Sequence, residues 1–274
     1  MATPDFDAAA VRAFEHARWQ RAAARYDATF AHATQPFIGP LLDAVQVTGG
    51  TRLLDIACGP GLVASVAHQR GAAVRGLDFS PAMLAVARAR EPSVGFDEGD
   101  AEALPYPDGT FDAAVANFGI HHVPRPVLAL RETHRVLCPG GRVAFSFWAE
   151  PRENIAWELV LDAVARHGDL AAVQVPAPGG GFGTAGQCAA ALEAAGFSGC
   201  TIRTVHATWQ HRDAEALVAA LCAGTARMAA VLDAQSPVAM HAIVYDVDRH
   251  AEAYRNSAGI GVPIAAFIVC GDRL

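Results

Sequence analysis

The sequence predicts a doubly wound α/β fold, built on a mostly parallel sheet of seven strands with a helical cap. In the first half of the chain, short segments that are apolar almost throughout are separated by helical segments at regular intervals. Such strands are typical of a parallel sheet covered by helices on both faces, with right-handed crossovers. The 274 residues, 52% of them hydrophobic, are also enough to bury a large core.

Five strands and three helices are expected between residues 51 and 148. Ser80 is expected to cap the second of these helices, with Pro81 at its first position. Pro139-Gly140-Gly141 is expected to end the third helix. The expected strands are Thr51–Ala57, Ala73–Asp78, Val94–Gly99, Phe111–Asn117 and Arg142–Trp148, and the expected helices are Leu62–Arg70, Pro81–Arg90 and Pro126–Leu137.

The remaining elements are less regular. Two late strands are expected to complete the sheet at one edge, and helices are expected to cover its open end. These strands are Thr201–Trp209 and Val262–Cys270, and the helices are Asp7–Tyr26, Asn154–His167, Gln187–Ala195 and alanine-rich sequence from about Asp213 to Tyr254. We expect a single domain over residues 1–274, with N-terminal helices forming a lid at 1–50 and a partly helical cap over the substrate site at 151–260.

The composition excludes several classes of function. All 21 basic residues are arginine, so the chain has no lysine for a Schiff base, for pyridoxal phosphate or for a phosphate loop. The formal net charge is −7 and the arginines do not cluster, which disfavours a nucleic-acid partner or an anionic membrane surface. The expected partner is a small molecule, and a homodimer is left open.

The cysteines and the first residues indicate a cytoplasmic protein. The six cysteines are scattered without a C-x-x-C pair, which is typical of reduced thiols. The first twenty residues carry acids and lack an apolar core, so they do not resemble a secretory signal. No run approaches the roughly 20 apolar residues that cross a bilayer.

A glycine turn follows the first expected strand, in Leu53-Leu54-Asp55-Ile56-Ala57-Cys58-Gly59-Pro60-Gly61. Glycines at this place let backbone N–H groups approach a ligand beyond the carboxyl end of the strand. With Ala64, the two glycines satisfy G-x-G-x-x-A. The pattern alone therefore also fits the dinucleotide site of an NAD(P)-dependent oxidoreductase.

Three acidic residues stand at neighbouring strand ends: Asp55, Asp78 and Asp100. An acid beside the turn would repel the pyrophosphate of a dinucleotide, whereas it would attract ammonium and hydroxyl groups. S-adenosylmethionine offers an ammonium, a sulfonium, a ribose diol and an adenine amine. Asp78 lies about 20 residues past the turn, where a carboxylate accepts ribose hydroxyls. Asp100 is expected at the adenine amine, with Phe79, Met83 and Ala101 against its ring.

Four segments in order resemble the successive motifs of class I S-adenosylmethionine-dependent methyltransferases, whose fold is Rossmann-like. They are LLDIACGPG, GLDFSPAMLAVARAR, GDAEALPYPDGTFDAAVANFGIHHV and ALRETHRVLCPGGRVAFSFW. The chain is most similar to the branch that contains ubiquinone and menaquinone biosynthesis methyltransferases, over about Thr51 to Trp148.

The resemblance implies a cofactor role for particular residues. It places Asp55, Ala57, Cys58, Gly59 and Gly61 around the methionine moiety, Asp78 at the ribose, Asp100 and Ala101 at the adenine, and Asn117 and Phe118 on the methionine side. The pair Tyr26-Asp27 matches a Tyr-Asp pair by which members of this branch close over the cofactor.

The pair His121-His122 invites a catalytic interpretation. Adjacent helical residues do not share a face and no third ligand is suitably spaced, so no metal site is expected. His122 is the better candidate for a general base, against the alternative that one histidine packs near the cofactor and the other is solvated. Four large aromatic residues are candidates for a pocket or for the core: Trp148, Trp157, Trp209 and Phe182.

We therefore expect a transferase that methylates an aromatic, quinone-like or heterocyclic metabolite, with O-, N- and C-methylation all open. His122 is the candidate catalytic residue, and no metal is expected. Three alternatives remain at this point. They are an NAD(P)-dependent oxidoreductase, a methyltransferase that acts on RNA or protein, which the charge balance disfavours, and a homologue that binds the cofactor without transferring a methyl group.

Overall fold

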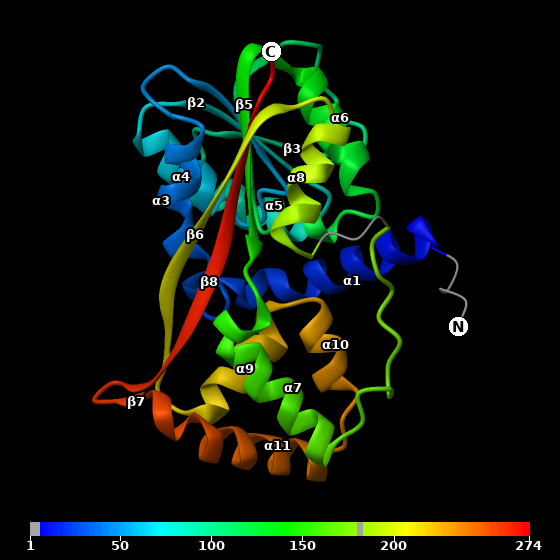
Figure 1. Cartoon of the computed structure of the whole chain (residues 1–274), viewed down its shortest axis with the longest axis vertical. Helices are drawn as coiled ribbons and strands as arrows, with labels where there is room; N and C mark the ends of the chain where they lie inside the picture. The colour runs from blue at the N-terminus through cyan, green and yellow to red at the C-terminus, as the bar shows by residue number, and fades with distance from the viewer. Residues whose placement is uncertain (1–5, 180–182) are drawn as a thin grey trace.

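The computed structural model of the chain describes residues 6–179 and 183–274, and it confirms the predicted α/β fold (Figure 1). Seven strands form one sheet in the order β3-β2-β1-β4-β5-β8-β6. These strands are β1 Arg52–Ile56, β2 Ala73–Asp78, β3 Gly95–Glu98, β4 Phe111–Asn117, β5 Leu137–Trp148, β6 Ser198–His211 and β8 Gly259–Asp272.

Strands β1 to β5 are mutually parallel, while β8 is antiparallel to both of its neighbours, β5 and β6. The two late strands therefore complete the sheet, as the sequence predicts. An eighth strand, β7 (Arg255–Asn256), pairs only with β8 and lies off the main path. The sequence does not predict it, because two residues carry no periodicity.

The helices follow the expected order, and α5 has the predicted bounds because Ser80 caps it through the Met83 N–H. A segment at residues 31–44, for which no individual helices are predicted, is also helical. The α-helices are α1 Ala8–Tyr26, α2 Ala31–Thr34, α3 Ile38–Ala44, α4 Leu62–Gln69, α5 Pro81–Arg90, α6 Pro126–Val136, α7 Ile155–His167, α8 Ala185–Ala194, α9 Ala214–Gly224, α10 Arg227–Asp233 and α11 Pro237–His250. The 3-10 turns are η1 Gln35–Phe37, η2 Ile120–His122, η3 Pro151–Glu153 and η4 Ala251–Tyr254.

Strand β5 begins earlier than the sequence predicts. It follows α6 directly, so Pro139-Gly140-Gly141 lies inside the strand instead of between a helix and a strand. The register with β4 shifts between Phe111 and Ala113, which accommodates the extra residues, and Gly140 takes a φ of +79°. Proline and glycine thus lie at a bulge here. The same residues are also common in turns, so the sequence pattern does not separate the two.

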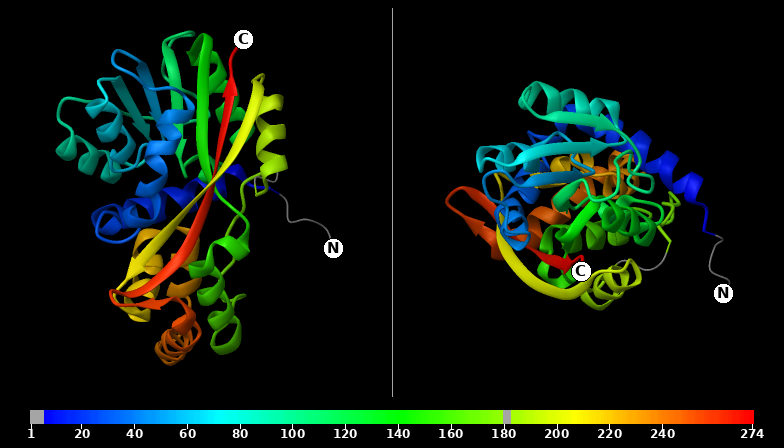
Figure 2. Two further views of the ribbon diagram at one scale, coloured as in Figure 1. Left: turned by 60° about the vertical axis from the view of Figure 1, so that its left-hand side comes forward. Right: turned by 90° about the horizontal axis from the view of Figure 1, so that it is seen from above.

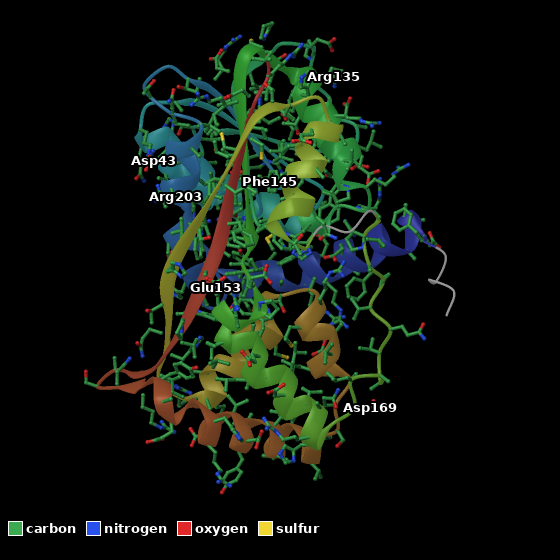
Figure 3. All side chains as sticks on the ribbon, viewed as in Figure 1. Asp43, Arg135, Phe145, Glu153, Asp169 and Arg203 are labelled. Carbon is green, nitrogen blue, oxygen red and sulfur yellow. The ribbon has the colours of Figure 1, made fainter. Side chains whose placement is uncertain are left out.

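The two faces of the sheet pack against separate hydrophobic clusters. Leu53 and Val115 belong to one cluster, whereas their chain neighbours Leu54 and Ala114 belong to the other. Phe145, in the middle of β5, is fully buried in the second cluster (Figure 3). This alternation is what a sheet covered on both sides requires.

Strands β6 and β8 run past the parallel strands toward a group of helices, α7, α9, α10 and α11, at one end of the molecule (Figures 1 and 2). Helix α1 crosses between this group and the carboxyl ends of the parallel strands. It packs on α5 from the sheet layer and on α9 from the cap. The site described next lies at this junction.

Within the described residues, no single helix has the length and apolarity to cross a membrane. Taken together, α9 and α10 pass the same test of length and composition, but they are bent by 114° at their junction.

Candidate functional site

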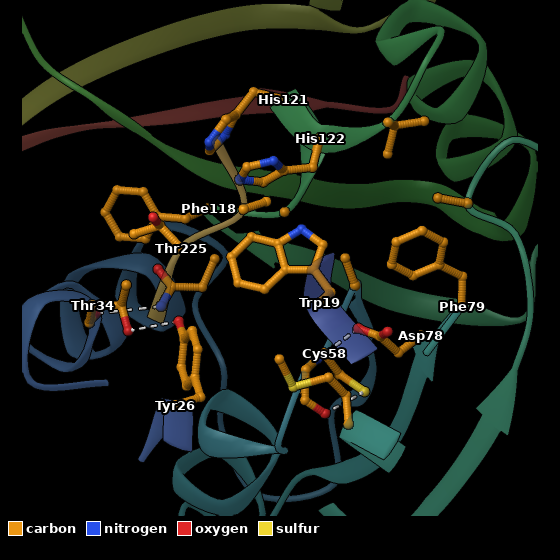
Figure 4. Close-up of a pocket in the computed structure, with 18 of the residues that line it drawn as sticks. Trp19, Tyr26, Thr34, Cys58, Asp78, Phe79, Phe118, His121, His122 and Thr225 are labelled. Atoms are coloured by element: carbon orange, nitrogen blue, oxygen red, sulfur yellow. Dashed lines mark hydrogen bonds between the residues drawn. The ribbon is translucent and has the colours of Figure 1, made fainter. Parts of the chain in front are cut away.

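A cavity of about 810 Å³ lies where the ends of β1 to β5 face α1, η2, α7 and α10 (Figure 4). Open α/β sheets bind ligands at this edge. The structure brings together all the predicted cofactor residues except Gly61. Those that line the cavity are Tyr26, Asp55, Ala57, Cys58, Gly59, Asp78, Phe79, Met83, Asp100, Ala101, Asn117 and Phe118.

Gly61 shapes the turn without lining the cavity. It stands at the N-terminus of α4 with a φ of +78°, and a Cβ there would lie 3.0 Å from the Cβ of Ala87. Only glycine combines this backbone conformation with such close packing. Helix packing thus requires glycine at this position, and its place beside the methionine moiety stays a prediction.

Asp55 is the most unusual carboxyl group of the site. Its side chain is 1% exposed, and neither oxygen has a hydrogen-bond partner within the described residues. Burial raises the pKa of Asp55 to about 8, with the backbone N–H of Ala64 acting against it and the charge of Asp78 adding to it. A buried carboxyl without partners is costly, so this position favours a ligand that brings a positive charge or a hydrogen-bond donor.

Asp78, at the end of β2, has partners on both oxygens. One oxygen accepts from the Gly59 N–H at 2.8 Å and the other from the Ser80 N–H at 2.8 Å. Burial nevertheless raises the pKa of Asp78 to about 6. These two hydrogen bonds leave a second lone pair on each carboxylate oxygen, which could accept from a ligand.

Asp100 lies at the more open rim, where Arg12 of α1 donates a hydrogen bond to it. Arg12 also donates to Glu102 at 3.1 Å, and Glu102 is buried and accepts from the Arg125 N–H at 2.8 Å. This network fixes α1 over the end of β3. All three predicted acids thus line one cavity.

Two residues of the cavity wall have left-handed backbone conformations without being glycine. Ala57 has a φ of +52° and Phe118 a φ of +54°. Phe118 stacks on Trp148 with ring centroids 4.0 Å apart, and its N–H donates to the fully buried Ser146 Oγ at 2.8 Å. Such strain persists only where surrounding contacts impose it, and it gathers at functional sites.

Asn117 and Tyr26 are held by neighbours as well as facing the cavity. The Asn117 amide oxygen accepts from Ser146 Oγ at 2.7 Å, and its nitrogen donates to the Thr34 carbonyl at 3.3 Å. The Tyr26 hydroxyl lies 3.3 Å from Thr34 Oγ1, and burial raises the pKa of Tyr26 to about 12. Asp27, the second residue of the predicted pair, is exposed and pairs with Arg90, outside the cavity.

His121 and His122 both line the cavity, contrary to the expectation that they would diverge. They lie in the single turn of η2, where their rings are 4.2 Å apart. Burial lowers the pKa of His121 well below its usual value, and its Nδ1 is buried without a hydrogen-bond partner in the described part of the chain. His122 Nδ1 lies within hydrogen-bond distance of Glu15 Oε2, at 2.9 Å.

Comparison with known proteins supports the resemblance that the motifs indicate. Residues 54–145 match the family model described as a methyltransferase domain. This segment includes the acids and the glycine turn. The match covers about a third of the chain. The resemblance predicted from the motifs is confirmed.

The curated relatives are more similar to the chain in sequence than the solved structures are. The chain is 40% identical over 111 residues to a demethylmenaquinone methyltransferase of Renibacterium salmoninarum, covering 40% of this chain and 47% of that protein. It is 50% identical over 99 residues to a ubiquinone/menaquinone biosynthesis C-methyltransferase of Methylobacterium nodulans. This match covers 33% of this chain and 39% of that protein. The chain thus spans about half the length of the curated relatives it matches, or less.

Solved structures share the fold of most of the chain. The YcgJ protein of Bacillus subtilis is 19% identical, with a TM-score of 0.58, covering 86% of this chain and 97% of that one. The [4+2]-cyclase SpnF is 22% identical, with a TM-score of 0.53, and the match covers 88% of this chain and 81% of that one. A fold shared by proteins with such different names does not by itself fix a reaction.

Three candidate residues at the cavity are not found by sequence reasoning: Glu15, Trp19 and Arg227. Glu15 is fully buried, while Trp19 and Arg227 line the cavity. A weak signal exists for the first two, because Glu15 and Trp19 are four residues apart and share a helix face. No local pattern distinguishes Arg227 from the arginines on the surface.

The aromatic candidates divide between pocket and core. Trp148 and Trp157 line the cavity with ring centroids 4.6 Å apart, and Phe30 packs edge-on against both. Trp209 is 1% exposed and belongs to the core. Phe182 lies outside the described residues. Among the described residues, no group of three or more His, Cys, Asp or Glu could hold a metal ion.

Proposed function

We propose that this protein transfers a methyl group from S-adenosylmethionine to an aromatic, quinone-like or heterocyclic small molecule. The observation that carries the proposal is Asp55, a buried carboxyl whose oxygens have no hydrogen-bond partner among residues 6–179 and 183–274, on a cavity that Asp78 and Asp100 also line. A ligand that is both cationic and rich in hydroxyl and amino donors satisfies all three acids. The transfer to oxygen, nitrogen or carbon is left open.

The residues of the cavity fit this cofactor by their chemistry. Asp55 would hold the ammonium of the methionine moiety, Asp78 the ribose hydroxyls and Asp100 the adenine amine, with Phe79 and Met83 against the adenine ring. When bound, S-adenosylmethionine supplies a methyl group that its sulfonium charge already activates. The chain therefore contributes mainly alignment of the two reactants and exclusion of water.

The acceptor would bind against the aromatic residues of the cavity. Phe118, Trp148 and Trp157 offer flat apolar surfaces, and a planar ring packs well against such surfaces. The relatives named as demethylmenaquinone and ubiquinone/menaquinone methyltransferases support a quinone-like acceptor. His122 would accept the proton of an acceptor hydroxyl.

The oxidoreductase alternative is not favoured. It requires a dinucleotide at the glycine turn, where its pyrophosphate would meet the buried Asp55 and Asp78. The family match over residues 54–145 includes this same turn and describes a methyltransferase.

Methyl transfer can be tested directly with S-adenosylmethionine labelled on its methyl group. The acceptors are 1,4-naphthohydroquinones, catechols and phenols, and the readout is a mass shift of one methyl group in the product. We expect labelled product from at least one hydroquinone or phenol with the native protein. D55N is expected to lose this activity, whereas D43N, which removes an exposed acid on α3, is expected to keep it. Label transfer that survives D55N unchanged would contradict the proposal.

A further inference from the structure

Glu15 is a fully buried carboxylate on α1 that joins three elements at the cavity wall. It accepts hydrogen bonds from His122 Nδ1 at 2.9 Å, from Trp19 Nε1 at 3.0 Å and from Arg227 Nε at 3.0 Å. His122 belongs to η2 and Arg227 to α10. Burial alone would raise the pKa of Glu15, but His122 and Arg227 outweigh it and hold this pKa below its usual value.

This arrangement determines which nitrogen of His122 carries its proton. An ionised carboxylate only accepts hydrogen bonds, so Nδ1 must be the donor. The neutral ring then keeps its basic lone pair on Nε2, for which the structure gives no hydrogen-bond partner within the described residues. A histidine whose tautomer is fixed by a buried carboxylate is a frequent general base.

The ring of His122 is also held from its sides. Trp19 packs edge-on against it with ring centroids 5.0 Å apart, and His121 lies 4.2 Å away. The close-up shows His122 between the His121 and Trp19 rings, with Asp78 and Cys58 beyond Trp19 (Figure 4). The charged and titratable groups around the ring are Glu15 from α1, Arg227 from α10 and the neighbouring His121.

We propose that Glu15 is a positioning residue, which fixes His122 in the Nδ1–H tautomer and directs its Nε2 to the hydroxyl of the acceptor. The acceptor O–H bond breaks, a new N–H bond forms at Nε2, and the electron pair stays on the acceptor oxygen. The Glu15 carboxylate offsets the positive charge that the ring gains. This inference rests on the proposed function for the identity of the acceptor.

Arg227 completes the arrangement. It keeps a buried carboxylate ionised without occupying the oxygen that faces His122, since Arg227 Nε donates to Oε1 while His122 donates to Oε2. Because the three partners come from α1, η2 and α10, the histidine is positioned only when the N-terminal helix and the cap are packed together. This explains why a charged residue occupies the buried face of α1.

The test compares E15Q with R18Q. The side-chain amide of glutamine has one oxygen that accepts hydrogen bonds, whereas the carboxylate has two. When that oxygen accepts from Arg227, the amide N–H₂ group faces His122. R18Q is the matched control, because Arg18 pairs with Asp233 and so also links α1 to α10, but neither residue lines the cavity. The proton position on His122 is read by long-range ¹H–¹⁵N NMR of protein labelled on histidine, with the signal assigned by its loss in H122N.

We expect the native protein and R18Q to show the Nδ1–H tautomer of His122, and E15Q to gain the Nε2–H tautomer. An Nε2–H ring in the native protein would overturn the proposal, whatever the folding of the variants. So would an equal tautomer shift in E15Q and R18Q, because helix packing alone would then be responsible.

Kinetics provide a second arm. With S-adenosylmethionine and an active 1,4-naphthohydroquinone, E15Q is expected to lower kcat by about tenfold or more and to leave the KM for S-adenosylmethionine unchanged. An unchanged kcat in E15Q would overturn the positioning role. Failure of the native protein to transfer methyl to any acceptor counts against the proposed function alone, since the NMR result is independent of it.

Discussion

Gly119 lies directly against Ala57, so closely that a Cβ at position 119 would stand 2.6 Å from the Ala57 Cβ. Ala57 is one of the cavity residues with a left-handed backbone conformation, at a φ of +52°. The turn after β1 and the turn after β4 therefore meet at the methyl group of Ala57. This contact links the glycine turn to the loop that carries the two histidines.

The first prediction concerns this pair. G119A is expected to lower the free energy of unfolding by about 1–3 kcal/mol, because overpacking forces one of the two turns to move. A57G is expected to raise it by about 1 kcal/mol through relief of the left-handed alanine. Thermal or denaturant unfolding measures both.

The double variant A57G/G119A is expected to recover most of the stability that G119A loses, since the second Cβ is gone. G186A serves as the control, because a Cβ at this helical glycine meets nothing within 4 Å. A change in the double variant that equals the sum of the two single changes would show that the contact is not the cause.

The second prediction concerns the pH dependence of stability. The pKa of Asp55 is raised to about 8 in the folded chain, above its unfolded value. The folded state therefore binds more protons, and without ligand the free energy of unfolding falls as the pH rises from about 4 to 8. D55N removes this decline. The free energy of unfolding of D55N, relative to that of the native protein, is therefore expected to grow toward pH 8 by about 2 kcal/mol or more.

Urea unfolding at pH 5, 6, 7 and 8 measures this slope in both proteins. Parallel curves for the native protein and D55N would show that Asp55 titrates normally.

The third prediction concerns Asp78. D78N is expected to weaken S-adenosylhomocysteine binding by about 1–3 kcal/mol, the usual value of a hydrogen bond to a charged group. Because Asp78 also accepts from the Gly59 and Ser80 N–H groups, some loss of stability is expected as well. Calorimetry measures the affinity and thermal unfolding the stability. D43N supplies the control, and unchanged affinity in D78N would contradict the ribose role.

The fourth prediction concerns His122. H122A is expected to lower turnover at saturating substrates by about 100-fold, the usual contribution of a general base. H241A, which removes an exposed histidine on α11, is expected to keep the native rate. Single-turnover measurement of methyl transfer separates this step from product release. A rate in H122A within about threefold of the native one would show that this histidine only packs against the cavity.

The sequence predicts well those elements whose signals are local. β2, α5 and β4 have the predicted bounds, because apolar runs, the Ser80 cap and Pro81 all act over a few residues. The convergence of Asp55, Asp78 and Asp100 also follows from local signals, since parallel strands end at the same edge.

The missed features depend on contacts between distant segments. Nothing in α1 shows that Glu15 is buried, because its cover comes from η2 and from Arg227, 212 residues away. The shared cavity of His121 and His122 was also unpredicted, since η2 is a single 3-10 turn rather than part of a helix. The early start of β5 depends on pairing with β4, which local glycine and proline signals do not report.

The central claim is that the acids on this cavity select a cationic adenosyl ligand over one that carries phosphates. Isothermal titration calorimetry of the native protein with S-adenosylhomocysteine and, separately, with NADH tests it most directly. The account predicts saturable binding of S-adenosylhomocysteine, weakened in D55N, and no binding of NADH. Binding of NADH without binding of S-adenosylhomocysteine would contradict it.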